Sequence, residues 1–130
     1  MKIMVCFDGS NVAKDALDLA KKRAKALGAK IELVMSMVGG PEVPKDEFDK
    51  AEKNLIKAKT SVRKDDIPCE TLLSVRGLEA GEDLVRFAKE EEVDEIYIGI
   101  KKRSKVGKFI FGSTAQYVIL EAHCPVVTVK

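Results

Sequence analysis

The sequence predicts an α/β fold, in which an open, doubly wound parallel sheet of five strands carries helices on both faces. Five short apolar segments alternate with four amphipathic segments over the whole length. Strands that are joined by single helices pair in parallel through right-handed crossovers. The first, fourth and fifth apolar segments are nearly continuous, which is typical of strands buried on both faces.

The first half of the chain predicts two strands and two helices. The strands are expected at Lys2–Phe7 and Ile31–Met37, because each is a short apolar run next to turn-forming residues. The helices are expected from Asn11 to about Leu27 and from Asp46 to Lys64, where apolar residues recur every three or four positions. We expect Asn11 to cap the first helix and Gly28 to end it.

The second half continues the alternation. Strands are expected at Cys69–Val75, Glu95–Ile100 and Pro125–Val129, and helices at Glu79–Glu92 and Ser113–Ala122. No repeat, low-complexity tract or long linker interrupts the pattern, so we expect residues 1–130 to form one domain.

Composition excludes several classes of function. The 23 basic and 21 acidic side chains leave a net charge of +2, too small for a general nucleic-acid-binding surface. Charged residues make up 34% of the chain, which also argues against a membrane protein. The three cysteines form no CxxC pair and no signal peptide is evident, so we expect a cytoplasmic protein. A histidine-cluster metal site is excluded, because His123 is the only histidine.

Ligands of such sheets bind at the carboxyl ends of the strands, where the strand order reverses. No GxGxxG and no GxxxxGK[ST] occurs in the chain, so neither a dinucleotide fingerprint nor a P-loop is present. The segment after the fourth strand instead carries Lys101, Lys102 and Arg103, and it leads into Gly112-Ser113-Thr114 at a helix start. Backbone N–H groups at a helix start suit a phosphate. The alternative is a solvated basic loop that is followed by an ordinary capping serine.

Three other polar or soft side chains have two interpretations each. Asp8, directly after the first strand, could accept hydrogen bonds from ribose hydroxyls or form an Asx-turn into the first helix. Met37 could pack on a base or belong to the core. For His123, at a helix end, a capping or helix-dipole contact is favoured over catalysis.

The chain resembles the universal stress proteins over its whole length. The residues that carry this resemblance are Phe7-Asp8-Gly9-Ser10, Val75-Arg76-Gly77, Gly99 with the loop into Gly112-Ser113, and Cys124-Pro125-Val126-Val127. Nucleotide-binding members of that family share Gly-x-x-Gly, nine residues, then Gly-Ser or Gly-Thr. Here Gly99-Ile100-Lys101-Lys102 is followed by nine residues and Gly112-Ser113, so the spacing is kept and Lys102 replaces the second glycine.

The resemblance implies a Rossmann-like sheet of order 3-2-1-4-5 that holds ATP between the ends of the first and fourth strands, with Mg²⁺ carried by the phosphates. The implied binding residues fall into groups: the backbone of Phe7 and Met37 near the adenine, Asp8 at the ribose, and Gly99, Gly112, Ser113 and Thr114 at the phosphates. Ser10 is a further implied binding residue. Lys101, Lys102 and Arg103 would add positive charge. The family also implies a homodimer through the last strand, Pro125–Val129.

We therefore expect an adenine-nucleotide-binding regulatory homodimer of the stress response. Little or no hydrolysis is expected, because no general base or metal-binding carboxylate pair is evident beside the phosphates. Two alternatives stay open. One is a protein-interaction dimer of the same fold that has lost nucleotide binding through Lys102, and the other, weaker one is an ATP-cleaving enzyme.

Overall fold

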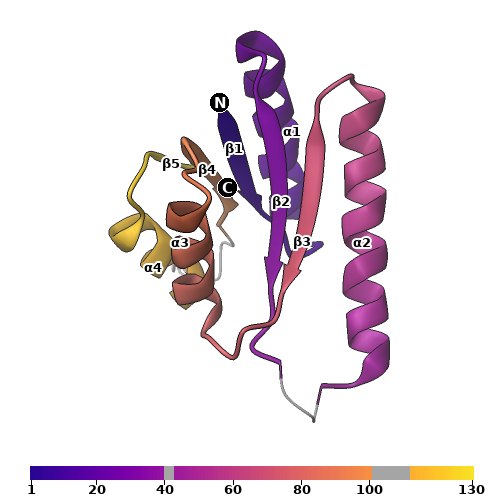
Figure 1. Ribbon diagram of the computed structural model, residues 1–130, viewed down its shortest axis with the longest axis vertical. Helices are drawn as coiled ribbons and strands as arrows, with labels where there is room; N and C mark the ends of the chain where they lie inside the picture. The colour runs from indigo at the N-terminus through magenta and orange to yellow at the C-terminus, as the bar shows by residue number, and fades with distance from the viewer. Residues whose placement is uncertain (40–42, 101–111) are drawn as a thin grey trace, which may run out of the picture.

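The computed structural model describes residues 1–39, 43–100 and 112–130. Its centre is a five-stranded sheet of order β3-β2-β1-β4-β5 in which every neighbouring pair is parallel (Figure 1). The elements in chain order are β1 (Lys2–Cys6), α1 (Asn11–Leu27), β2 (Lys30–Ser36), α2 (Lys45–Lys64), β3 (Cys69–Ser74), α3 (Ala80–Glu90), β4 (Glu95–Gly99), α4 (Ser113–Glu121) and β5 (Val126–Val129). The predicted fold class and strand order are confirmed, and the element boundaries differ from the predicted ones by at most two residues.

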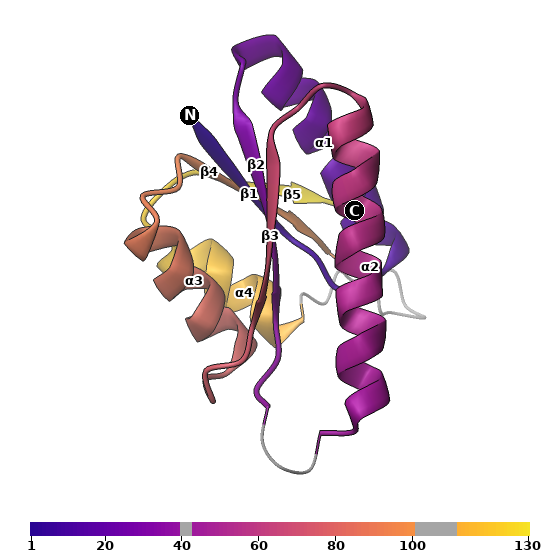
Figure 2. The same cartoon turned by 45° about the vertical axis from the view of Figure 1, so that its right-hand side comes forward.

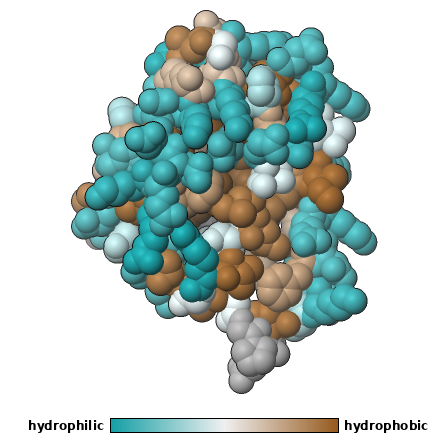
Figure 3. Space-filling model, viewed as in Figure 1, coloured by the Kyte–Doolittle hydropathy of each residue, from teal (hydrophilic) through white to brown (hydrophobic). Residues whose placement is uncertain are grey.

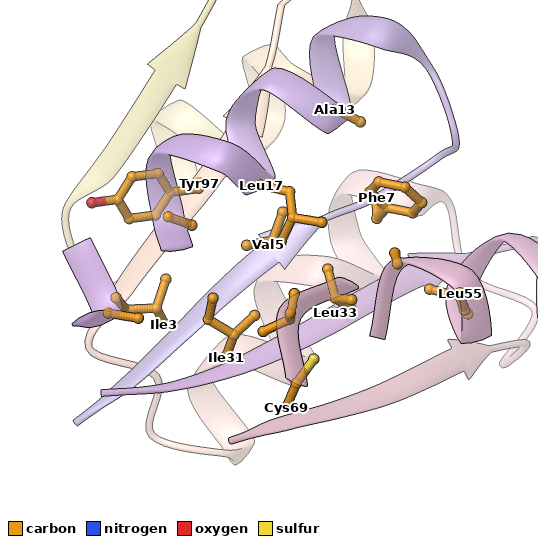
Figure 4. Close-up of a cluster of buried hydrophobic side chains, with 14 of the residues drawn as sticks. Ile3, Val5, Phe7, Ala13, Leu17, Ile31, Leu33, Leu55, Cys69 and Tyr97 are labelled. Atoms are coloured by element: carbon orange, nitrogen blue, oxygen red, sulfur yellow. The ribbon is translucent and has the colours of Figure 1, made fainter. Parts of the chain in front are cut away.

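Helices cover both faces of the sheet. Helices α1 and α2 lie on one face, and α3 and α4 lie on the other (Figures 1 and 2). The core is accordingly divided into two clusters of buried side chains. The larger one joins α1 and α2 to the sheet through residues such as Val5, Leu17 and Leu33 (Figure 4). The smaller one joins α3 and α4 to the opposite face through residues such as Met4, Leu84 and Val118.

The start of α1 corrects one sequence prediction. The N-cap is Ser10 and not Asn11, since the Ser10 hydroxyl accepts a hydrogen bond from the Ala13 N–H at 3.2 Å. Asn11 is instead the first residue inside the helix. The other end is as predicted, because Gly28 adopts the left-handed conformation at φ 64° and donates its N–H to the Ala24 carbonyl.

On the face of the molecule that Figure 3 shows, hydrophilic side chains surround an apolar area. Figure 3 shows apolar side chains gathered over the ends of β2 and β3, beside α3. Exposed apolar residues at these strand ends include Val38, Leu72 and Val75. None of the helices in the described ranges combines the length and the apolar character that crossing a membrane requires.

Candidate functional site

A hollow of about 330 Å³ lies at the carboxyl ends of β1, β2 and β4, beside the first turns of α3 and α4. This is the edge of the sheet at which the strand order reverses, where α/β folds bind their ligands. Its described lining residues are Cys6, Phe7, Asp8, Ser10, Ala13, Val34, Met35, Ser36, Ala80, Leu84, Ile98, Gly99, Gly112, Ser113, Thr114 and Ala115. We call this hollow the strand-end pocket.

The structure brings most of the predicted site residues together in this pocket. Those that line it are Phe7, Asp8, Ser10, Gly99, Gly112, Ser113 and Thr114. Lys101, Lys102 and Arg103 lie outside the described residues. Met37 is placed differently from the others: it packs against the α1–α2 side of the core, and its N–H donates to the Ser74 carbonyl at 2.8 Å. On the β2 side the pocket is lined by Met35 and Ser36 instead.

The first turn of α4 offers the pocket a place for an anion. Gly112 is the N-cap, with φ −60° and ψ 154°, and within the described chain no side chain caps this helix start. The Ser113, Thr114 and Ala115 residues that begin the helix line the pocket. Uncapped N–H groups and the positive end of the helix dipole favour a negative group there. Among the described atoms, a Cβ on Gly112 would meet nothing within 4 Å, so the glycine leaves open space at the helix start.

Gly99 has a packing role that the sequence did not reveal. A Cβ at this position would lie 2.7 Å from both the carbonyl carbon and the carbonyl oxygen of Val12, and 2.9 Å from the Ala13 nitrogen. The first turn of α1 therefore crosses the end of β4 at backbone contact distance. Only glycine permits this approach, whether or not a phosphate also comes close to it.

Asp8 sits at the exposed mouth of the pocket, directly after β1. One carboxylate oxygen accepts the Ser10 N–H at 2.9 Å, which is the Asx-turn foreseen as one interpretation of this residue. The turn thus fixes the orientation of a carboxylate at the pocket lining. Burial, assisted by the negative charge of Asp8, raises the pKa of the neighbouring Cys6 thiol to about 12. Cys6 is therefore an uncharged part of the wall.

A buried carboxylate beside the pocket was missed by the sequence analysis. Asp83 in α3 is 1% exposed. Its carboxylate accepts one hydrogen bond from the Ser36 hydroxyl, at 2.5 Å, and another from the Arg76 Nε–H, at 2.6 Å. Arg76 also contacts Glu90 at 3.2 Å. Although burial opposes ionisation of Asp83, hydrogen bonds from Ser36, Ser74 and Arg76 outweigh it and lower its pKa.

The signal for Asp83 was present in the sequence. It occupies the same helix face as the buried Leu84, Phe87 and Ala88, where a carboxylate needs a partner. Arg76, seven positions earlier, is that partner. This network ties the first turns of α3, which supply Ala80 and Leu84 to the pocket, to the end of β2.

Among the described residues, neither His123 nor a metal cluster adds reactive groups to the pocket. The Nε2 atom of His123 lies 3.0 Å from the Val93 carbonyl oxygen, a backbone contact rather than a catalytic arrangement. In the part of the chain that the structure describes, no three histidine, cysteine, aspartate or glutamate side chains are grouped to hold a metal ion.

Comparison with known families gives a match over the entire chain. The model of the universal stress protein family matches residues 1–130. The chain belongs to this family. The resemblance drawn from the strand-end motifs is thereby confirmed.

Individual universal stress proteins agree with this assignment. One from Thermus aquaticus is 32% identical, over 98% of this chain and 97% of that protein. The structure of a universal stress protein from Archaeoglobus fulgidus superposes with a TM-score of 0.92 at 39% identity, covering 100% of this chain and 98% of the other. A second Archaeoglobus fulgidus structure, of a universal stress protein in complex with dAMP, has a TM-score of 0.87 at 34% identity, with the same coverage.

Proposed function

We propose that this universal stress protein binds adenine nucleotides, ATP in particular, and acts in the cytoplasm as a regulatory homodimer of the stress response. The observation that carries the proposal is the strand-end pocket, in which the uncapped start of α4 and the Asp8 turn face the same space. The dAMP complex of a relative at 34% identity supports an adenine nucleotide as the ligand class.

The order of strands suggests how the ligand lies. β2, β1 and β4 are neighbours, so the pocket extends over two strand spacings, roughly 10 Å. Phosphates fit the start of α4, with Gly112, Ser113 and Thr114, because N–H and hydroxyl donors gather there. The sugar then falls near Asp8 and the base near the end of β2. A Mg²⁺ ion would arrive with the phosphates.

Slow or absent hydrolysis follows from the polar groups of the pocket. Among its described lining residues, Asp8 is the one carboxylate, and one of its oxygens already accepts the Ser10 N–H. A general base must be within hydrogen-bond reach of the attacking water, and efficient hydrolysis usually needs a metal-binding group as well. The proposal is therefore a nucleotide-dependent regulator rather than an ATPase.

The proposed dimer uses the edge of the sheet at β5. This strand pairs with β4 on one side, where the Pro125 carbonyl accepts the N–H of Ile96 in β4 and the Val129 carbonyl accepts the N–H of Ile100, just after β4. Alternate residues such as Thr128 direct their backbone groups to the other side, where an edge strand can pair with a second copy. Thr128→Pro removes one of these outward N–H groups, so we expect the variant to elute as a monomer, with its mass measured by light scattering. A wild-type protein that is itself monomeric contradicts the dimer.

Calorimetric titration with ATP tests nucleotide binding. We expect Ser113→Ala to weaken binding by about tenfold, since one hydroxyl contact to a charged phosphate is worth about 1.5 kcal/mol. Ser61→Ala removes the same hydroxyl from the exposed face of α2 and should leave the affinity unchanged. Lys102→Gly restores the glycine of the family motif. If ATP binds to that variant alone, the interaction-dimer alternative is correct; if neither protein binds ATP at millimolar concentration, the nucleotide proposal is wrong.

A further inference from the structure

Ser36 is the polar side chain that the end of β2 contributes to the strand-end pocket. It stands two strands away from β4, and hence at the far end of the pocket from Gly99. Its neighbours in the lining there, Val34, Met35 and Leu84, are apolar. With phosphates at the start of α4, Ser36 is therefore the hydroxyl that a base in this pocket would meet.

The direction of the Ser36 hydrogen bond is fixed by its partner. Asp83 is 1% exposed and receives hydrogen bonds from the Arg76 guanidinium at 2.6 Å and from the Ser36 hydroxyl at 2.5 Å. An ionised carboxylate has no hydrogen to give, so the Ser36 hydroxyl has to be the donor. A separation of 2.5 Å is within the range of a charge-assisted O–H···O⁻ bond. Because its one hydrogen is used, the Ser36 hydroxyl can only accept any further hydrogen bond, through the lone pairs of its oxygen.

The Arg76–Asp83 pair keeps the carboxylate ionised. Desolvation of Asp83 favours its neutral form, but the hydrogen bonds from Ser36, Ser74 and Arg76 outweigh that effect and lower its pKa. Arg76 is itself held by Glu90, at 3.2 Å, on the side away from Asp83. Arg76, from the loop after β3, thus keeps Asp83 of α3 ionised, and Asp83 in turn fixes the direction of the Ser36 hydroxyl at the end of β2. The strand β2 and the helix α3 are seen together in Figures 1 and 2.

We propose that Ser36, oriented by Asp83, selects the base of the bound nucleotide by accepting a hydrogen bond from an exocyclic amine and disfavouring a carbonyl at the same position. This inference rests on the proposed nucleotide function and adds the residue that would favour a 6-aminopurine base over a 6-oxopurine base. A carbonyl oxygen that faced Ser36 would meet another acceptor, and both oxygens would then lack a hydrogen. Asp83 does not touch the ligand in this scheme and is a positioning residue.

ATP and ITP form the matched pair of probes. They share the sugar and the triphosphate, and they differ only at the purine edge, where ITP carries a carbonyl in place of the amine and an N1–H in place of the N1 lone pair. The ratio of their dissociation constants therefore cancels the phosphate and sugar contacts. We expect wild-type protein to bind ATP about tenfold more tightly than ITP, which corresponds to about 1.4 kcal/mol and lies within the usual cost of leaving a polar group unpaired in a pocket.

Three variants separate Ser36 from the rest of the network. Ser36→Ala should bring the ITP/ATP ratio to within about twofold of one. In Asp83→Asn we expect the amide oxygen to keep the Arg76 bond and the amide NH2 to face Ser36, which frees the Ser36 hydroxyl to donate. The ratio should therefore fall there too, while a change of fold alone would weaken both nucleotides equally. Ser74→Ala is the control: Ser74 also bonds Asp83 but is absent from the pocket lining, so the ratio should stay as in wild type.

The outcomes distinguish this inference from the proposed function. If ATP and ITP bind wild-type protein equally well, the inference is overturned and nucleotide binding stands. If ATP is preferred but Ser36→Ala keeps the full preference, another group reads the base and the inference is again overturned. If neither nucleotide binds, both the inference and the proposed function are wrong.

Discussion

Gly99→Ala should destabilise the protein although it adds a single methyl group. The new Cβ would lie 2.7 Å from the Val12 carbonyl carbon and oxygen, where an ordinary contact is 3.4 Å or more. One side must therefore shift by about 0.7 Å or more. Neither side is a flexible side-chain end: Gly99 is paired with Val129 of β5, and the first turn of α1 is held by the Ser10 cap.

The expected cost is near the upper end of the range for overpacking, about 3 kcal/mol in the free energy of unfolding. For a chain of this size that corresponds to a fall in melting temperature of about 10 °C. Urea unfolding followed by circular dichroism measures it. Gly112→Ala is the matched control, because a Cβ there meets no described atom within 4 Å and its φ of −60° suits alanine. A Gly99→Ala protein within about 1 kcal/mol of the Gly112→Ala protein would refute the close-approach argument.

Three further predictions concern the α1 cap, the buried carboxylate and the thiols. Ser10→Ala should lower the free energy of unfolding by about 1 kcal/mol in urea titrations, because the Ala13 N–H loses its partner; no change would mean that another group caps the helix. The pKa of Asp83 is lowered in the folded protein despite burial, through its hydrogen bonds, so its stabilisation is present at neutral pH and is lost as the pH falls through the folded-state pKa. Asp83→Asn should therefore start less stable but lose less stability than wild type between about pH 5 and pH 2; equal acid slopes in urea titrations would contradict this. Burial raises the pKa of Cys6 to about 12 and that of Cys69 to about 11, so iodoacetamide at pH 8 should alkylate them only after unfolding; mass spectrometry detects the modification, and labelling of folded protein at the rate of a free thiol would contradict it.

The elements of the fold were predictable because their signals are local. Apolar runs and turn residues located all five strands, and Gly28 marked the end of α1 correctly. The cap of α1 was misassigned to Asn11 because Ser10 and Asn11 are both good N-cap residues, and only the backbone conformation separates them.

The site was predictable where the chain itself lies at the strand ends, as with Asp8 and Ser113. It was less predictable where the position of a residue depends on packing between elements that are far apart in the sequence. The backbone crossing at Gly99 and the contact of Ser36 with Asp83, 47 residues later, depend on how α1 and α3 dock on the sheet. The position of Met37 was also not predictable, since its main-chain N–H donates to the carbonyl oxygen of Ser74 in the adjacent strand β3, which is a long-range pairing.

The division of the core into two clusters also bears on how a bound molecule leaves. The wall of the strand-end pocket takes Phe7 and Met35 from the α1–α2 cluster, and Val34 and Leu84 from the α3–α4 cluster. Local unfolding of either helical layer alone, α1 with α2 or α3 with α4, would displace one wall of the pocket. The residence time of any occupant is then limited by the layer that opens more often, and hydrogen exchange of the two layers, with and without ligand, would identify which one acts as the exit.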